Sequence, residues 1–375
     1  MISGVTGMDG SHMVDFLLEN TPHKIIGLVR RLSVKNWKNI EHNLNNPRFN
    51  TVEVDITDSV NINSVISDNK PDYFIHFAAA SFVGNSWTQP ENHIQTNSLS
   101  LLYILESVRK YSPHTRVYQA SSSEMFGDVL EVPQSENTPF NPSSVYGVSK
   151  ATAHFLLDVY RKSYGIYCVG GILFNHESSS GRRGIEFVTR HITSNVARIF
   201  KSISRSETFE PLLIGQINSR RDWSAAEDFC DGIWRMLNQE IYNKELKKIC
   251  ENIPPENLTK FLSNQIKHYV MSSDETHTVR EFIELAFKAI GIDGFWNGDG
   301  TNEKFFVNNY LAEELPHLGI NPLVIIDKNR FRPNDVKLLI GNSKLIRDEL
   351  GWKPTIKFSD LVKKMVNADL ALTFS

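Results

Sequence analysis

Residues 4–10 read Gly-Val-Thr-Gly-Met-Asp-Gly and stand directly before a helical pattern at about residues 9–20. Glycines in this G-x-x-G-x-x-G spacing allow a tight turn, a close approach of the backbone to a phosphate group and close packing of a helix on a strand. Alone, the spacing also occurs in plain turns. Only Met1, Ile2 and Ser3 precede the first glycine, so we expect a very short first strand.

The residues that follow alternate short apolar runs with longer amphipathic ones. We predict strands at 24–29, 51–54, 73–77, 116–120 and 167–173, and helices at about 59–69, 96–110 and 145–164. Strands separated by helices favour a parallel sheet covered on both faces, so the predicted fold class is α/β with a doubly wound (Rossmann) sheet. In this context the glycine stretch predicts a dinucleotide site, and ligands should gather at the carboxyl ends of the strands.

After about residue 175 this alternation ends. Helical patterns near 184–203, 223–238 and 279–290 stand among shorter Pro- and Asn-rich pieces and indicate a smaller, mostly C-terminal α/β domain for the substrate. We assign residues 1–175 to the dinucleotide domain and 176–375 mainly to the second, with segments at about 205–240 and 268–285 crossing between them. Residues 240–267 are typical of a helical surface insertion, to which we assign no chemistry.

Composition narrows the function classes. The 375 residues are 41% hydrophobic, and 40 basic against 43 acidic side chains leave a net charge of −3. This balance gives no overall field that favours nucleic acid or an anionic membrane. Three cysteines without a CxxC spacing indicate reduced thiols, and we find neither a membrane-spanning stretch nor a leader. We therefore expect a cytoplasmic protein, without a metal site.

The end of the second predicted strand indicates the nucleotide. Arg30 and Arg31 stand where a protein that prefers NAD usually carries an acidic residue for the ribose 2′-hydroxyl. Arginine would instead pair with a 2′-phosphate, which favours NADP; a solvated surface pair is the alternative. Asp55, after the third strand, is placed to approach the adenine. Ala78 and Ala79, after the fourth, would let the dinucleotide lie close, although alanines suit a core equally well.

Tyr146 and Lys150 lie four residues apart at the start of a predicted helix, so both project from one face. A lysine ammonium near a phenol favours the phenolate, and a nicotinamide cation adds to this effect. The pKa of Tyr146 should therefore move from about 10 toward the working range. Tyr146 is a candidate base for a hydroxyl proton during hydride transfer. An ordinary pair on a helix surface would have the same spacing.

Ser122 and Glu124 follow the predicted strand 116–120, at the carboxyl edge where the site should lie. In an extended chain two residues apart, their side chains would face the same side. A hydroxyl could steady a sugar oxygen while a carboxylate moves a carbon-bound proton. The alternative is ordinary turn chemistry, with Glu124 capping a helix.

These motifs together resemble those of the GDP-mannose 4,6-dehydratase family, among the extended short-chain dehydrogenases/reductases, from the first glycine to about residue 369. The motifs at 4–10 and 146–150 are shared by many nucleotide-sugar enzymes. More particular are Arg-Arg-Leu-Ser at 30–33, Gln-Ala-Ser-Ser-Ser-Glu-Met-Phe-Gly at 119–127, Phe-Asn-His-Glu-Ser at 174–178, Phe-Val-Thr-Arg at 187–190, Arg-Asp-Trp at 221–223, Glu-Thr-His-Thr-Val-Arg at 275–280, Arg-Pro at 332–333 and Leu-Gly-Trp-Lys-Pro at 350–354.

The resemblance implies a hydro-lyase that converts GDP-mannose to GDP-4-keto-6-deoxymannose and water through an internal NADP hydride cycle. Tyr146, helped by Lys150, would deprotonate the sugar 4-hydroxyl while hydride passes from C4 to NADP⁺. Glu124 would then remove the C5 proton and assist loss of the 6-hydroxyl, with Ser122 hydrogen-bonding near O4. Hydride would finally return to C6, so that the cofactor ends unchanged.

The same resemblance implies binding roles and an assembly. For Arg221 and Arg332 a structural salt bridge remains the alternative, and for His176 a core histidine. The loop 31–42 would reach a neighbouring subunit, which suggests a homotetramer or homodimer. The implied cofactor residues are Gly4, Thr6, Gly7, Asp9, Gly10, Arg30, Asp55, Ile56, Ala78, Ala79, Ser81, Tyr146, Lys150, His176 and Arg183, and the implied substrate residues are Ser81, Ser122, Asn175, Arg221, Arg332 and Asp335.

Several positions depart from the family pattern, and they cluster more around the substrate and the nucleotide than around the acid–base groups. Ser122 replaces a threonine, His191 replaces a lysine, and Asp335 replaces a glutamate. The reaction class is therefore better indicated than the sugar, and a GDP-heptose is an alternative substrate. The rivals are an NDP-sugar epimerase, reductase or decarboxylase, and a catalytically silent NADP-binding assembly subunit. Glu124 argues against a simple epimerase or reductase, which needs no carboxylate for elimination.

Overall fold

The computed structural model describes residues 1–308, 321–330 and 338–374. Its larger lobe is built on a seven-stranded sheet of order β11-β6-β5-β4-β1-β2-β3, with every neighbouring pair parallel. The predicted doubly wound α/β fold is confirmed, and the order reverses between β1 and β4. The strands are β1 (Ile2–Ser3), β2 (Ile25–Val29), β3 (Phe49–Glu53), β4 (Tyr73–His76), β5 (Arg116–Ser122), β6 (Cys168–Leu173) and β11 (Tyr269–Met271).

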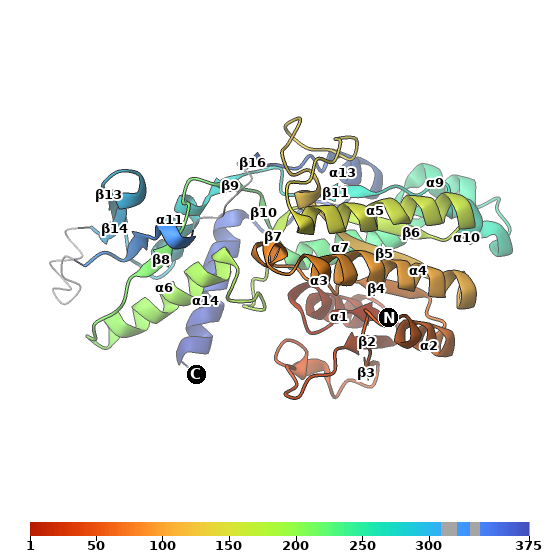
Figure 1. Cartoon of the computed structure of the whole chain (residues 1–375), viewed down its shortest axis with the longest axis horizontal. Coiled ribbons are helices and arrows are strands. Elements are labelled where there is room, and N and C mark those ends of the chain that lie inside the picture. The colour runs from red at the N-terminus through yellow and green to blue at the C-terminus, as the bar shows by residue number, and fades with distance from the viewer. Residues whose placement is uncertain (309–320, 331–337, 375) are drawn as a thin grey trace.

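Helices cover both faces of this sheet (Figure 1). On one face α1 (Met8–Asn20) packs against α7 (Ala226–Leu237). On the other face α2 (Ser59–Asn69), α4 (Ser100–Tyr111) and α5 (Val145–Tyr164) pack side by side. Each face has its own buried apolar cluster, which explains why the strands between them are apolar on both sides. A short helix α3 (Pro90–Ile94) and a π-helical turn at Gln95–Leu99 precede α4.

Helix α5 brings the predicted Tyr-x-x-x-Lys pair to the carboxyl edge of the sheet. It begins after Ser144, whose side-chain oxygen accepts a hydrogen bond from the Gly147 amide at 3.0 Å. It ends at Gly165, which adopts a left-handed φ of 67°. Tyr146 and Lys150 therefore lie in its first two turns.

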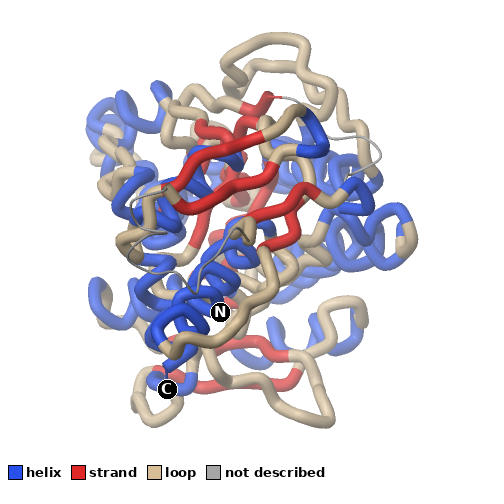
Figure 2. Tube along the Cα trace, turned by 90° about the vertical axis from the view of Figure 1, so that its left-hand side faces the viewer, coloured by secondary structure: helices blue, strands red, loops and turns tan. Residues whose placement is uncertain are grey.

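The smaller lobe has a four-stranded sheet of order β13-β14-β15-β8, packed against α6, α11 and α14 around a separate apolar core (Figures 1 and 2). Its strands are β8 (Leu212–Ile214), β13 (Gly294–Asn297), β14 (Lys304–Val307) and β15 (Val324–Ile326), and its helices are α6 (Val188–Ser204), α11 (Val279–Lys288) and α14 (Phe358–Phe374). Over the part of the chain that the structure describes, none of the helices has the length and apolar character to span a membrane.

Between the lobes the chain crosses several times. Several elements that follow β10 in the sequence belong to the large lobe. They are α7, α8 (Gln239–Tyr242), α9 (Lys244–Cys250), α10 (Pro255–Ser263), β11 and α13 (Lys344–Leu350). The predicted helix at 223–238 is wrong over its first three residues, because β10 (Trp223–Ala225) pairs with β7 (Asn175–Glu177). A further sheet joins β12 (His277–Thr278), β9 (Arg220–Arg221) and β16 (Leu338–Leu339).

Candidate active site

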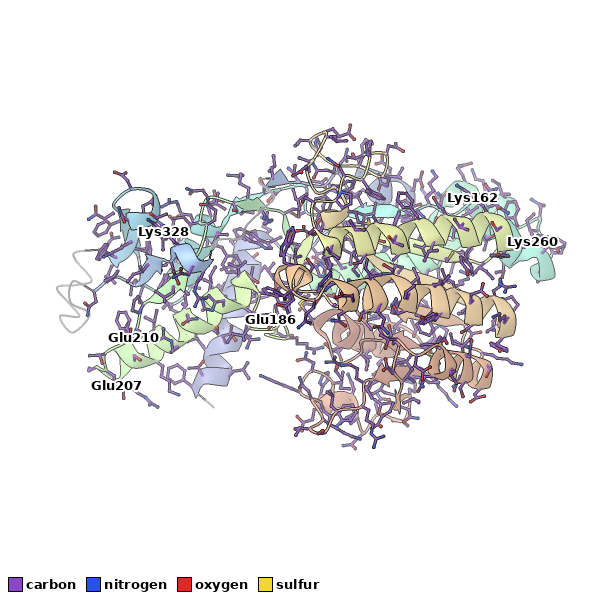
Figure 3. The ribbon with its side chains drawn as sticks, viewed as in Figure 1. Lys162, Glu186, Glu207, Glu210, Lys260 and Lys328 are labelled. Atoms are coloured by element: carbon purple, nitrogen blue, oxygen red, sulfur yellow. The ribbon has the colours of Figure 1, made fainter. Side chains whose placement is uncertain are left out.

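A cavity of about 520 Å³ opens at the carboxyl edge of the large sheet, where the smaller lobe meets it. Glu186, which lines the cavity, lies at the junction of the two lobes, far from Lys162 and Lys260 at the outer end of the large lobe (Figure 3). Both lobes contribute walls. The predicted site residues that the structure brings together here are Asp9, Ala79, Ser81, Ser122, Glu124, Tyr146, Lys150, Asn175, His176, Arg183 and Arg221.

The other predicted cofactor residues lie beside this cavity rather than in its walls. They follow the carboxyl ends of the adjacent strands β3, β2, β1 and β4, which is where a doubly wound sheet holds a dinucleotide. They are Gly4, Thr6, Gly7, Gly10, Arg30, Asp55, Ile56 and Ala78. Two predicted substrate residues, Arg332 and Asp335, fall outside the described residues.

The glycine turn is shaped as the sequence predicts. Gly4 has a φ of 70°, and a Cβ there would lie 2.7 Å from the Ala78 amide nitrogen. A Cβ on Gly10 would lie 2.3 Å from the Gly4 carbonyl oxygen, so these two glycines permit the turn and the close packing of α1. On Gly7 a Cβ would meet only that same oxygen, at 3.2 Å, among the described atoms. The space in front of Gly7 therefore fits a phosphate approaching the start of α1.

Arg30 and Asp55 mark the adenine end of this row. Arg30 directly follows β2 and is exposed, as a side chain that meets a 2′-phosphate must be. The Asp55 carboxylate is also exposed, and its Oδ1 accepts hydrogen bonds from the Thr57 amide at 2.9 Å and the Thr57 hydroxyl at 2.7 Å. Asp55 thus already shapes the turn after β3.

Asp9 and His176 form a buried ion pair between α1 and β7. The His176 Nδ1 donates to the Phe174 carbonyl oxygen at 2.8 Å, and its Nε2 donates to Asp9 Oδ1 at 2.9 Å. Burial disfavours the charged form of each residue, but the opposite charge and the hydrogen bond of its partner together outweigh burial. The pKa of His176 is therefore raised, and the pKa of Asp9 is lowered to about 2. The pair carries little net charge, and it ties the glycine turn to the strand that carries Asn175.

The catalytic candidates of helix α5, Tyr146 and Lys150, face the end of β5. The buried Lys150 ammonium donates to the Ala120 carbonyl oxygen at 2.9 Å and lies 5.9 Å from the centre of the Tyr146 ring. Burial lowers the pKa of Lys150 to about 8, against the charge of Asp9, which raises it.

Tyr146 is held protonated by the protein's own groups. Burial raises the pKa of its phenol to about 12; a hydrogen bond with Ser122 lowers the pKa, and the charge of Glu124 raises it. In the protein alone the pKa of Tyr146 therefore lies above its ordinary value, and the expectation that Lys150 together with a nicotinamide cation brings it toward the working range stays a prediction. Burial of the phenol disfavours its anion, and the neighbouring charge of Glu124 adds to this effect.

The structure also corrects the geometry of Ser122 and Glu124. Ser122 ends β5, but Glu124 lies in a 3₁₀ turn at Ser123–Met125, so the chain between them is not extended. The Glu124 amide donates to the Ser122 hydroxyl oxygen at 3.2 Å, which makes Ser122 the cap of that turn. Both residues still line the cavity, because the 3₁₀ turn directs Glu124 to the same side as Ser122.

On the side of the smaller lobe, Arg183 and Arg221 bring positive charge to the cavity. The Arg183 Nε donates to the buried Glu177 carboxylate at 2.8 Å, and its guanidinium carbon lies 4.4 Å from the centre of the Phe187 ring. Arg221 is 9% exposed, and its Nη1 donates to the Arg220 carbonyl oxygen at 2.8 Å. A guanidinium is well suited to a phosphate group because its N–H donors form a planar fork that can pair with two phosphate oxygens.

Sequence reasoning missed several cavity residues. They are Phe82, Phe187, His191, Gln216 and Arg330. Phe82 and Phe187 meet edge to face, with ring centres 5.8 Å apart, across the junction of the lobes. Phe187 and His191 lie within or beside a family-like motif, which is a signal that could have found them. Phe82, Gln216 and Arg330 stand in no motif, and only the fold brings them here.

Comparisons with known proteins agree over the whole chain. A family model described as "GDP-mannose 4,6 dehydratase" matches residues 1–252 and 256–365. The GDP-mannose 4,6-dehydratase of Vibrio cholerae serotype O1 is 34% identical over 378 residues, covering 99% of this chain and 93% of that protein. The GDP-mannose 4,6 dehydratases of Drosophila melanogaster and Homo sapiens are 36% and 34% identical over 380 residues, covering 99% of this chain and 86% and 91% of theirs.

Solved structures of lower identity share the fold. A dTDP-glucose 4,6-dehydratase from Bacillus anthracis, in complex with NAD, has a TM-score of 0.71 at 19% identity and covers 98% of this chain and 94% of its own. A UDP-glucose 4-epimerase from Thermotoga maritima, with UDP-glucose, has a TM-score of 0.72 at 19% identity, covering 100% and 99%. Because the family model matches almost the whole chain and the relatives exceed 30% identity along its length, the chain belongs to the GDP-mannose 4,6-dehydratase family.

Proposed function

We propose that this chain converts GDP-mannose to GDP-4-keto-6-deoxymannose and water, as a hydro-lyase that uses NADP. The observation that carries the proposal is the gathering of Tyr146, Lys150, Ser122 and Glu124 on one cavity. A phenol and a carboxylate on one cavity fit a reaction that removes a proton from oxygen and another from carbon. The resemblance of the sequence to the family supports the same chemistry.

The residues along the carboxyl ends of β3, β2, β1 and β4 fit a dinucleotide. The open space at Gly7 and the start of α1 would take the pyrophosphate, and Arg30 would pair with the 2′-phosphate that distinguishes NADP from NAD. The rest of the dinucleotide would contact Thr6, Asp9, Ile56, Ala78, Ala79 and Ser81. Its nicotinamide end would lie near His176 and Arg183. When bound, NADP⁺ would accept hydrogen from the sugar C4 and return it to C6.

Tyr146 would take the proton of the 4-hydroxyl. Burial holds the phenol protonated, and the hydrogen bond from Ser122 opposes this effect. The positively charged nicotinamide ring of a bound NADP⁺ would oppose it too. Lys150, fixed on the Ala120 carbonyl oxygen, would add positive charge and orient the site. Ser122 would also hold the sugar O4 next to Tyr146.

Glu124 would perform the elimination. A ketone at C4 makes the C5 proton acidic, so the carboxylate would remove that proton and then pass it to the 6-hydroxyl, which leaves as water while a C5–C6 double bond forms. The 3₁₀ turn at Ser123–Met125 places this carboxylate on the cavity beside Ser122 and Tyr146. An epimerase or a ketone reductase has no elimination step for such a group.

The substrate would lie across the junction of the lobes. Asn175 and Ser81 would contact the sugar, and Arg221 the diphosphate, with Arg332 and Asp335 assigned from the resemblance alone. This division assigns residues 1–175 mainly to the cofactor and 176–375 mainly to the substrate. His191 and Arg330 line the smaller lobe's wall, with an Nη1–Nε2 distance of 3.4 Å, and fit the same anionic portion.

The proposal includes a homodimer or homotetramer in the cytoplasm. Helix α5 carries a row of exposed apolar side chains, Val148, Phe155 and Val159, that a second copy would cover. The loop after β2 adds exposed Leu32 and Val34. The three cysteines are free thiols, in keeping with a reducing compartment. Light scattering of the native chain and of Phe155→Asp tests the assembly: the native chain should be a dimer or tetramer and the variant smaller.

The activity is tested by incubating the purified chain with GDP-mannose and a trace of NADP⁺. We expect a product lighter by one water that absorbs in alkali as a 4-keto sugar, without net accumulation of NADPH. A product of unchanged mass would indicate an epimerase instead. NADP⁺ binding without any product, from GDP-mannose or from a GDP-heptose tested in parallel, would indicate a non-catalytic subunit.

A further inference from the structure

Two histidines, one buried and one partly buried, lie behind β5 and outside the cavity's walls. His154, on α5, and His268, just before β11, have ring centres 4.3 Å apart. The His154 Nδ1 and the Ser121 hydroxyl oxygen are 2.8 Å apart in a buried hydrogen bond. Ser121 is the residue before Ser122 and itself lines the catalytic cavity. The pair therefore touches the end of β5 from behind.

His268 has one protonation state that satisfies its neighbours. Its Nδ1 accepts from the Gly170 amide at 2.8 Å, so its ring proton must be on Nε2, which donates to Asp158 Oδ1 at 3.1 Å. Burial lowers the pKa of both histidines, in agreement with two neutral rings in contact. His268 thus fixes the wall against which the His154 ring packs.

Gly170 leaves the space in which the hydrogen bond forms. A Cβ at this position of β6 would lie 2.9 Å from both His154 Nδ1 and Ser121 Oγ, and 3.0 Å from Leu157 Cδ1. The same glycine donates its amide to His268. One residue therefore accommodates His154 and anchors the ring beside it.

His154 is the third residue of α5 that faces the last three residues of β5. Tyr146, Lys150 and His154 are each one helical turn apart. Ser122 lowers the pKa of the neighbouring Tyr146 phenol, Lys150 donates to the Ala120 carbonyl oxygen, and His154 hydrogen-bonds with Ser121. The third contact, like the second, is a buried hydrogen bond, and its two residues are 6% and 3% exposed.

We propose that His154 is a positioning residue, whose hydrogen bond to Ser121 aligns α5 with the end of β5 and so sets Tyr146 against Ser122 and Glu124. This inference rests on the proposed dehydratase activity. Because the contact lies behind β5, its loss displaces the catalytic groups and leaves the arginines of the smaller lobe in place. The chemical step should suffer while binding of the nucleotide sugar is kept.

The test is a mutant cycle on the full-length chain with GDP-mannose as substrate. His154→Phe keeps a ring and removes Nδ1, and Ser121→Ala removes the other partner without crowding. We expect each to lower kcat by roughly ten- to hundredfold, the loss that a displacement of about 1 Å can cause, with KM within about twofold. The double variant should be no worse than the more affected single one, because both remove the same bond.

A conservative variant and a control complete the design. His154→Asn places an amide near the former Nδ1 and should recover most of kcat, whereas Ser163→Ala, an exposed position at the far end of the same helix, should match the native chain. If Ser121→Ala and His154→Phe both keep kcat within twofold, or if their losses multiply, the positioning role is refuted. Should the His154 variant not fold, Ser121→Ala with its KM and kcat decides alone. A native chain that fails to convert GDP-mannose would instead refute the proposed function.

Discussion

Replacing Gly7 and Gly10 separately by alanine should distinguish the two roles of the glycine turn, which are phosphate binding and the packing of α1. A Cβ at residue 10 would lie 2.3 Å from the Gly4 carbonyl oxygen and 2.7 Å from the Val5 Cα, both of them backbone atoms. A Cβ at residue 7 would meet one atom at 3.2 Å, and Gly7 has φ −73° and ψ 175°, which alanine adopts freely. We therefore expect Gly10→Ala to damage packing and Gly7→Ala to damage phosphate binding.

The two effects have different sizes. Gly10→Ala forces α1 away from the turn, at an overpacking cost of about 1–3 kcal/mol. For a chain of this length that cost lowers the melting temperature by roughly 1–4 °C. Gly7→Ala replaces a glycine at the N-cap of α1 and should cost less than about 1 kcal/mol in folding. Its methyl group, however, blocks a charge-assisted hydrogen bond to the phosphate, worth about 1.5–3 kcal/mol, or roughly ten- to hundredfold in affinity for NADP⁺.

The assay pairs differential scanning calorimetry with calorimetric titration of NADP⁺ on the native chain and both variants. We expect Gly7→Ala to melt near the native chain and bind NADP⁺ weakly, and Gly10→Ala to melt lower. A folded Gly7→Ala protein that binds NADP⁺ as tightly as the native chain would refute the phosphate cradle. A Gly10→Ala protein that melts within half a degree of native would refute the packing argument.

Three further variants test the site. Glu124→Gln should lower dehydration by about 10²–10⁴-fold, the usual contribution of a general base, with GDP-mannose affinity largely kept; normal amounts of 6-deoxy product would contradict the role given to Glu124. Arg30→Ala should weaken NADP⁺ by about tenfold or more and NAD⁺ little, because only NADP⁺ carries the 2′-phosphate; equal losses in titrations of the two would exclude that pairing. Lys150 has a folded pKa of about 8, below its ordinary 10.5, so its charge disfavours folding below pH 8 and this cost disappears as pH rises to 10.5. Lys150→Met should abolish turnover. Because it removes the buried charge, it should also raise the free energy of unfolding in denaturant by up to about 3 kcal/mol at pH 7, and this gain should shrink between pH 8 and pH 10.5. A gain independent of pH would show that burial of the charge is not its source.

The sequence allowed the sheet and its ligand edge to be predicted because both depend on local patterns. Runs such as Ile25–Val29 and Cys168–Leu173 are apolar on both faces, as strands covered by helices must be, and they were located to within a residue or two. The glycine turn and the Tyr146 to Lys150 spacing are equally local. The strands of two or three residues that join the lobes, such as β10, are too short for any periodicity to show.

The local sequence pattern was thus sufficient to predict the doubly wound fold, and it supplied the residues that we propose for the dinucleotide site and the catalytic set. The tertiary structure decided how those residues act. Asp9 meets His176 across 167 positions of chain, and Phe82 meets Phe187 across the two lobes. The turn that carries Glu124 onto the cavity and the burial that raises the pKa of Tyr146 are likewise set by packing. Periodicity and motifs report only near neighbours along the chain, whereas ionisation and proximity depend on every group that folding brings within a few ångströms.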